Sequence, residues 1–265
     1  TFGKDTTLGS EVLKTGVLIV TKRLDTGSPW PLGNNPKGKY FRAPKDAEWI
    51  SNADYPLWKV VRASTAAPSF FDPETILISR KKGKKAQIGE FVDGGVSPFN
   101  NPTLQALMYA TLDGYRVRWK VGAENLLIVS VGTGMDDPSI GSSRVAAGGA
   151  VKSLLGLMKD CATLMETMMQ WIGTSPTSRP LDAEIQDLST DQLGNDPFFT
   201  YLRFDLPFTR EGLEPLKPGL KGSLIKSLSE MDNPENLDLL KELGDLAGNK
   251  QVRAHLFPDV FDLRH

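Results

Sequence analysis

The sequence is poor in the residues that build two common kinds of site. Its single cysteine, Cys161, excludes an intrachain disulfide and a thiolate metal cluster. Its two histidines, His255 and His265, both lie among the last eleven residues. This excludes a histidine-rich metal site and leaves only His255 as the base of a Ser-His-Asp triad. We therefore expect any catalytic proton transfer to use a carboxylate.

Neither charge nor hydropathy singles out a class of partner. Lys and Arg total 31 and Asp and Glu total 32, so the net charge of -1 gives no reason to expect nucleic-acid binding. No apolar run of about 18 residues and no signal-peptide core is present. We expect a cytoplasmic or peripherally membrane-bound protein without a metal or other cofactor. Because the chain begins at Thr1 without an initiator methionine, we also expect a processed product or a piece of a longer protein.

Strand and helix patterns alternate along the chain, which predicts an α/β fold. Short apolar runs rich in β-branched residues predict strands at residues 15–21, 76–78, 88–92, 126–131 and 198–206. Apolar residues spaced three and four apart predict helices at residues 56–66, 102–112, 151–172 and 234–248. Since strand, helix and strand follow one another between residues 88 and 134, we expect a parallel sheet covered by helices. No linker demands two domains.

Asp93 is the strongest single candidate for a catalytic residue. It directly follows the predicted strand 88–92, and α/β folds assemble their sites where strands end. Gly94 and Gly95 come next and allow a sharp turn and the close approach of another segment. An acid in this place can orient or deprotonate a hydroxyl nucleophile. The alternative is an aspartate that caps a turn, since Asp-Gly is a common turn dipeptide.

Three further motifs each have a functional and a structural interpretation, and we take the structural one as the default. Gly132-Thr133-Gly134 either cradles an anion with its backbone N–H groups or forms a plain turn. The basic residues 80–85 either contact anionic lipid headgroups or form the solvated tip of a hairpin. The helix predicted at 151–172 offers either an adaptable acyl-binding surface or core packing through Met158, Met165, Met168 and Met169.

The sequence lacks the usual signature of a serine nucleophile. No G-x-S-x-G occurs, so the strained turn that exposes such a serine is missing. No glycine-rich stretch near the start supplies oxyanion-hole amides. Ser64, Ser97 and Ser130 lie nearest to the motifs above, but none follows a strand-to-helix turn, so we expect each to be structural.

Three segments, in this order, resemble the patatin-like phospholipases, in particular their bacterial members. They are Ala63-Ser-Thr-Ala-Ala-Pro-Ser-Phe-Phe71, Phe91-Val-Asp-Gly-Gly95 with Asn101-Pro102 after it, and Ser130-Val-Gly-Thr-Gly134. The strand Phe199-Thr-Tyr-Leu-Arg-Phe204 and the helix at 233–246 also look like closing elements of that family. The resemblance therefore spans residues 13–246.

The resemblance implies a three-layer α/β/α fold, incomplete at its N-terminal side, with residues 1–265 as the C-terminal portion of the domain. It implies a Ser-Asp dyad that cleaves acyl esters of phospholipids or other lipids without a histidine. The aspartate of the dyad maps onto Asp93 and its glycines onto Gly94 and Gly95. The family's G-x-S-x-G and oxyanion loop would fall before Thr1. The resemblance thus implies an acyl-lipid substrate and a peripheral membrane contact, and the chain alone should be inactive.

Two alternatives remain at this point. The chain may be read as a non-catalytic patatin-like domain that binds lipid or a partner, in which Asp93 is a relic and the Met-rich helix is the contact surface. A weaker alternative is an unrelated nucleotide-binding α/β domain that uses the turn at 132–134.

Overall fold

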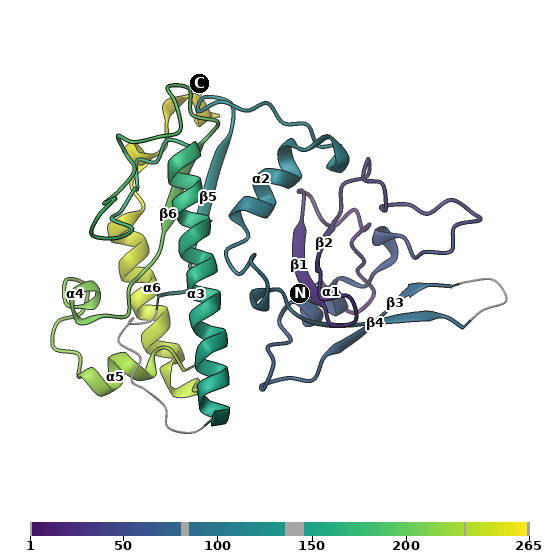
Figure 1. The fold of residues 1–265 in the computed structure, drawn as a ribbon, viewed down its shortest axis with the longest axis horizontal. Coiled ribbons are helices and arrows are strands. Elements are labelled where there is room, and N and C mark those ends of the chain that lie inside the picture. The colour runs from purple at the N-terminus through teal and green to yellow at the C-terminus, as the bar shows by residue number, and fades with distance from the viewer. Residues whose placement is uncertain (1, 81–84, 136–145, 231, 264–265) are drawn as a thin grey trace. The chain divides into compact units, whose positions relative to one another are not determined.

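The computed structural model describes residues 2–80, 85–135, 146–230 and 232–263 (Figure 1). The chain divides into two compact units. Unit 1 comprises Thr1–Lys120 and Lys152–Met165, and unit 2 comprises Val121–Val151 and Glu166–His265. That residues 1–265 are the C-terminal portion of one patatin-like domain stays a prediction.

Unit 1 is built on a four-stranded antiparallel sheet. Its strands are β1 (Leu18–Arg23), β2 (Pro29–Gly33), β3 (Glu74–Ser79) and β4 (Gln87–Asp93), in the order β2-β1-β4-β3. Short connections join β1 to β2 and β3 to β4, and short connections allow only antiparallel neighbours. The hairpin expected around residues 80–85 is present, although 81–84 lie outside the described residues.

The parallel sheet expected between residues 88 and 134 is wrong in its pairing. β4 pairs antiparallel with both β1 and β3, so its two edges are already occupied. The next strand, β5 (Leu127–Val131), belongs to unit 2 and pairs parallel with β6 (Thr200–Phe204). The predicted order of strand, helix and strand is present. The pairing differs because β4 already pairs with strands that precede it in the chain.

The first helix of unit 1 buries an apolar face against this sheet, and a second helix follows β4. α1 (Leu57–Ser64) begins after Pro56 and buries Leu57, Val60 and Ala63, which are three residues apart. α2 (Thr103–Thr111) begins after Pro102. The Thr103 N–H donates to Asn101 Oδ1 (3.2 Å), which satisfies one amide of the first helical turn. Short 3-10 turns lie at Asn52–Asp54, Gly94–Val96 and Asp113–Tyr115.

The core of unit 1 joins the sheet to α1. Phe91 on β4 is fully buried, and its ring stacks on Trp30 of β2 with centroids 4.8 Å apart. The remaining buried members of this cluster come from the N-terminal segment, β2, the residue pair before α1, α1 and β3: Leu8, Leu32, Tyr55, Leu57, Val60, Ala63 and Ile76. The same cluster fixes the strand that carries Asp93.

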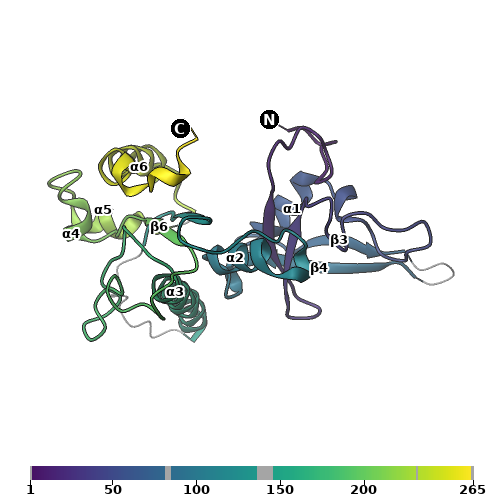
Figure 2. The ribbon, with the colours of Figure 1, turned by 90° about the horizontal axis from the view of Figure 1, so that it is seen from above.

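Unit 2 places its parallel strand pair between helices. β6 lies between α6 (Leu237–Gln251) and the C-terminal end of α3 (Ala146–Ile172), as Figure 2 shows. Two short helices, α4 (Arg210–Leu213) and α5 (Gly222–Ser227), complete a second core with α6. Further 3-10 turns lie at Pro234–Asn236, Ala254–Leu256 and Asp259–Phe261. Helices and sheets together confirm the α/β class, and the layering in this unit is α/β/α.

The predicted elements of unit 2 differ from the observed ones mainly at their ends. The strand expected at 198–206 is β6, shorter by two residues at each end. The helix expected at 151–172 begins earlier, at Ala146. Asn233 caps the last helical segment by accepting the Glu235 N–H (3.1 Å), but α6 continues past Gly248 to Gln251. Glycine is tolerated inside a helix when tertiary packing offsets its lower propensity.

No helix among the described residues is both long enough and apolar enough to cross a membrane.

Replacing Phe91 by alanine should destabilise the protein strongly. Phe91 is 0% exposed, so the substitution leaves a cavity between the sheet and α1 and lowers the free energy of unfolding by about 3–5 kcal/mol. Ile88 lies on the same strand but is 60% exposed, so Ile88→Ala should change this free energy by less than about 1 kcal/mol. Denaturant unfolding measures both values, and equal losses would contradict the assigned faces of β4.

Candidate active site around Asp93

The strand β4 delivers Asp93 to a crowded junction of backbone. Asp93 is the last residue of β4 and lies opposite Thr21 of β1. Its own N–H donates to the carbonyl of Ala66, just beyond the end of α1 (3.0 Å). Thr21 is buried, and its hydroxyl donates to the Val92 carbonyl (2.8 Å). Two strands and the end of a helix therefore fix the position of this carboxylate.

The two glycines after Asp93 allow this junction to close. A Cβ on Gly94 would collide with the backbone carbonyl of Val20, which cannot move away without breaking β1. A Cβ on Gly95 would lie 3.0 Å from both Asn100 Oδ1 and Asp93 Oδ1, and 3.3 Å from Met158 Cε. The close approach expected from the Asp-Gly-Gly pattern is thus present, with β1 as the approaching segment.

The Asp93 side chain caps the turn that follows it. Asp93 is the N-cap of the 3-10 turn Gly94–Val96, and its Oδ1 accepts the Gly95 N–H (2.7 Å). The turn-capping interpretation is therefore correct in geometry. It leaves the other oxygen, Oδ2, with no hydrogen-bond partner among the described residues, so capping and a second role for the carboxylate are compatible.

Burial dominates the electrostatics of Asp93. Desolvation raises the pKa of Asp93 above 3.8, and the hydrogen bond from the Gly95 N–H offsets part of this rise. Lys22 on β1 directs its Nζ to the Val96 carbonyl (3.0 Å), and within the described part of the chain no cation pairs with Asp93. A half-buried carboxylate with a raised pKa is a better proton acceptor than an exposed one.

The three serines near the motifs all make hydrogen bonds to other groups. Ser64 Oγ donates to the Val20 carbonyl (2.6 Å), and Ser97 Oγ donates to the Gly94 carbonyl (2.6 Å). Ser130 lies in unit 2, where Arg203 Nη1 donates to its Oγ (2.7 Å). These bonds tie turns and strands together, as expected for structural serines.

The turn at Gly132–Gly134 cradles an anion that belongs to the protein itself. The Gly134 N–H donates to Asp205 Oδ1 (3.0 Å), and Asp205 in turn pairs with Arg203. A Cβ on Gly132 would collide with the same carboxylate. The described turn therefore presents its amide to an internal side chain, which removes the observation behind the nucleotide-binding alternative.

Sequence reasoning missed the groups outside the motif that lie against Asp93 and its glycines. The Ala66 carbonyl accepts the Asp93 N–H, the Val20 carbonyl lies against Gly94, and Met158 Cε lies near Gly95. Backbone carbonyls carry no residue-type signal, so only the pairing register of β1 with β4 reveals them. Met158 had been singled out for the apolar face of its helix, but its approach to Gly95 has no counterpart in the spacing.

Part of the chain is similar to a known protein family. Residues 5–107 match the model of the patatin-like phospholipase family. Patatin-like protein 6 of Arabidopsis thaliana is 34% identical over 89 residues, which are 34% of this chain and 17% of that protein. Probable inactive patatin-like protein 9 of Arabidopsis thaliana is 36% identical over 82 residues, which are 31% of this chain and 20% of that protein.

These matches cover only part of this chain and a smaller part of each relative. The matched regions span about a fifth of the length of the two curated relatives. The family match contains Asp93, Gly94 and Gly95 together with β1, α1 and the hairpin that ends at Asp93. Residues 5–107 of this chain are therefore similar to the patatin-like phospholipases, as the resemblance of the motifs within them predicted, and we call them the patatin-like segment.

Proposed function

We propose that this chain supplies the aspartate of a Ser-Asp dyad in a serine lipid acyl hydrolase of the phospholipase A or lipase type. The patatin-like segment belongs to a family of lipid acyl hydrolase type. The observation that carries the proposal is Asp93 itself, a half-buried carboxylate at the end of β4 with a raised pKa and, among the described residues, no hydrogen-bond partner for its Oδ2. We assign Asp93 the catalytic role and Gly94 and Gly95 the role of motif glycines that shape the turn.

In this mechanism Asp93 acts first as a base and then as an acid. Its Oδ2 takes the proton of a serine hydroxyl while the serine oxygen attacks the ester carbonyl of the lipid. The tetrahedral intermediate collapses, the alcohol of the lipid leaves with the proton from Asp93, and an acyl-enzyme remains. Water then attacks the acyl-enzyme and loses a proton to Asp93, and Asp93 returns this proton to the serine oxygen as the fatty acid leaves. The Gly95 N–H holds Oδ1 throughout, so that Oδ2 keeps one orientation.

We place the nucleophilic serine and the oxyanion loop on a segment outside residues 1–265, with these residues as the C-terminal portion of the domain. Two observations support this placement. No G-x-S-x-G occurs in the sequence, and Ser64 and Ser97 direct their hydroxyls to backbone carbonyls. The substrate on this proposal is a phospholipid or another acyl lipid, reached by peripheral contact with a membrane.

A non-catalytic lipid-binding or partner-binding domain is the second candidate. One of the two relatives is named as a probable inactive patatin-like protein. On this candidate Asp93 keeps only its capping role, which its bond to the Gly95 N–H already fulfils. The two candidates differ in whether Asp93 affects turnover.

The first test concerns activity. The protein should be isolated as its source makes it, and its intact mass and N-terminus determined. If it contains a G-x-S-x-G, Asp93→Asn should lower kcat for phospholipid or fatty acyl ester hydrolysis by about 10²- to 10⁴-fold, because the general base is lost. Residues 1–265 alone should show no turnover.

Asp46→Asn is a matched control, because Asp46 is an exposed aspartate of the same unit. It should leave kcat unchanged within about twofold. Full activity of Asp93→Asn would show that another group is the base. A native protein without any such serine motif and without turnover would favour the binding domain.

The second test concerns stability against pH. Because burial raises the pKa of Asp93 above 3.8, the folded chain binds this proton more tightly than the unfolded chain, and the ionised form opposes folding at pH 7. Asp93→Asn removes that charge and keeps an oxygen for the Gly95 N–H. Its Tm at pH 7 should therefore equal or exceed that of the unchanged protein.

This advantage should shrink as the pH falls through the raised pKa and vanish below 3.8, where Asp93 is protonated in both states. Thermal unfolding followed by circular dichroism at several pH values measures the difference. A variant that is clearly less stable at pH 7 would show that the ionised carboxylate stabilises the fold more than its burial opposes it.

A further inference from the structure

A hollow in unit 1 is lined mainly by positive charge. Its volume is about 630 Å³, and its walls come from two segments, residues 36–42 and residues 116–118. We call it the basic hollow. Its lining contains no carboxylate, and its charged members are Lys37, Lys39, Arg42, Arg116 and Arg118. A chain with a net charge of -1 therefore gathers five cations in one depression.

Most of these cations are not neutralised by the protein. Arg118 pairs with Asp113 (Nε to Oδ1, 2.9 Å), but both side chains are largely exposed and such pairs contribute little. Arg116 uses Nη1 to donate to the Lys37 carbonyl (3.3 Å) and keeps its remaining donors. In the part of the chain that the structure describes, no carboxylate pairs with Arg116 or with the other three cations of the lining.

The arginines that line a pocket of unit 2 differ from those of the basic hollow, because carboxylates of the chain pair with them. A smaller pocket there, of about 320 Å³, is lined in part by Arg179, Arg203 and Asp205. Arg179 pairs with Glu166, and Arg203 pairs with Asp205. The arginines of that pocket are thus matched by carboxylates of the chain, whereas the basic hollow leaves its charge available to a ligand.

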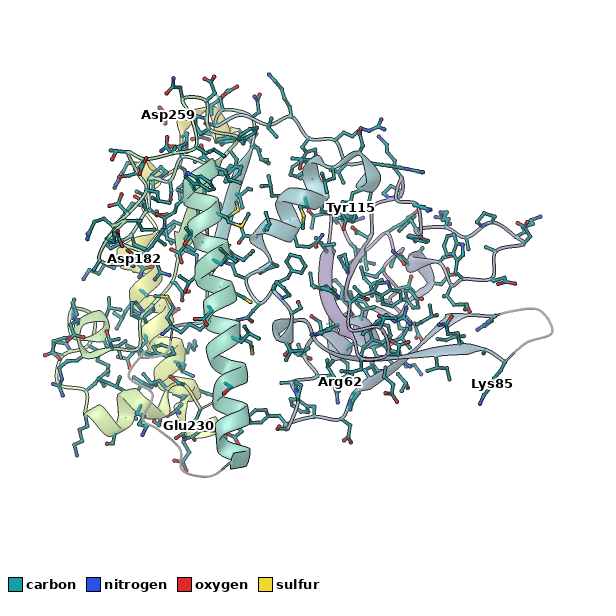
Figure 3. All side chains as sticks on the ribbon, in the orientation of Figure 1. Arg62, Lys85, Tyr115, Asp182, Glu230 and Asp259 are labelled. Carbon is teal, nitrogen blue, oxygen red and sulfur yellow. The ribbon has the colours of Figure 1, made fainter. Side chains whose placement is uncertain are left out.

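The walls of the basic hollow are held in place by hydrogen bonds and constrained backbone. Asn35 joins the two segments, because its Nδ2 donates to the Tyr115 carbonyl (2.8 Å) and its Oδ1 accepts the Lys37 N–H (3.0 Å). Figure 3 shows Tyr115 on the segment that follows α2. Arg116 and Arg118 both have φ of +60°, a conformation that non-glycine residues adopt rarely and often at functional sites.

We propose that the basic hollow binds a phosphate group. A phosphate presents several anionic oxygens at once, and arginine guanidinium groups match its geometry with paired hydrogen bonds. Arg42 and Arg116 come from the two different lining segments, so a phosphate bound by both arginines would bridge these segments. This proposal is independent of the catalytic role of Asp93 and of the hydrolase proposal.

The phosphate can belong to a lipid headgroup or to a free anion. Two exposed aromatic residues adjoin the lining: Tyr40 is 51% exposed and Trp119 is 62% exposed. Tyrosine and tryptophan are enriched where proteins meet the membrane interface. The experiment therefore uses two probes, inorganic phosphate and vesicles of phosphatidylcholine with or without phosphatidic acid.

The test compares two double variants with the same loss of charge. Arg42→Gln/Arg116→Gln removes one arginine from each wall, and Lys4→Gln/Lys14→Gln removes two exposed lysines of unit 1 outside the lining. The first should weaken binding of the effective probe by about thirtyfold, and the control by less than about threefold. Calorimetry measures phosphate binding, and sedimentation with vesicles measures lipid binding.

The outcomes separate the two sources. Phosphate binding that the hollow variant loses and the control keeps supports a free anion as ligand. Binding to phosphatidic acid vesicles that the hollow variant loses, without binding or competition by inorganic phosphate, supports a headgroup. Binding of neither probe by the unchanged protein, or equal losses in both variants, overturns the proposal.

Two further measurements distinguish a loss of binding from a loss of folding. Arg42→Lys/Arg116→Lys keeps the charge and should restore most of the vesicle binding, and its Tm should match that of the unchanged protein. If Arg42→Gln/Arg116→Gln has a lowered Tm, Lys37→Gln/Lys39→Gln replaces it, because these lysines donate no side-chain hydrogen bond within the described residues. Unaltered binding by that folded variant overturns the proposal.

Discussion

The contact between Gly94 and the backbone of β1 is the constraint on which the rest of the site depends. β4 ends where its next residue lies against the Val20 carbonyl, so closely that a Cβ there would collide with it. This contact lies next to Asp93 and helps to fix its position. Asp93 pairs with Thr21 of β1, and its N–H donates to the Ala66 carbonyl. Three backbone segments that are distant in sequence therefore meet at one carboxylate.

Burial of the ionised Asp93 side chain opposes folding, and the capping of the turn does not require this charge. Burial raises the pKa of Asp93, so the ionised side chain is less favourable in the folded protein than in the unfolded chain. An asparagine could cap the turn through the same contact with the Gly95 N–H without this cost. On the proposed function, proton transfer accounts for a carboxylate at this position, and the same carboxylate caps the turn. Such exchanges of stability for chemistry are common at active sites.

Much of the fold follows from local patterns, whereas strand partnership does not. The periodicity of apolar residues located α1, α3, β6 and the β3–β4 hairpin, because each pattern reflects the burial of one face. The parallel partner predicted for β4 was wrong, because β1 and β3 already occupy both of its edges and β5 pairs with β6 instead. The motif Asp93-Gly94-Gly95 was identified from its neighbours in sequence, but Val20 and Ala66 contribute carbonyls, which every residue has.

The turn Gly132–Gly134 and the basic hollow show two ways in which sequence patterns mislead about anion binding. A motif can indicate a site that the protein fills itself, and a near-zero net charge can hide a local cluster of cations. Gly132–Gly134 looked like a cradle for a ligand, and the structure gives its amide the carboxylate of Asp205, which lies far along the chain. The basic hollow had no motif in the sequence, since its arginines and lysines come from two distant segments that hydrogen bonds of Asn35 and Arg116 join. A net charge near zero excludes a strong long-range field but not a local one. Charge that the fold leaves unpaired, rather than charge summed over the sequence, indicates where an anionic partner can bind.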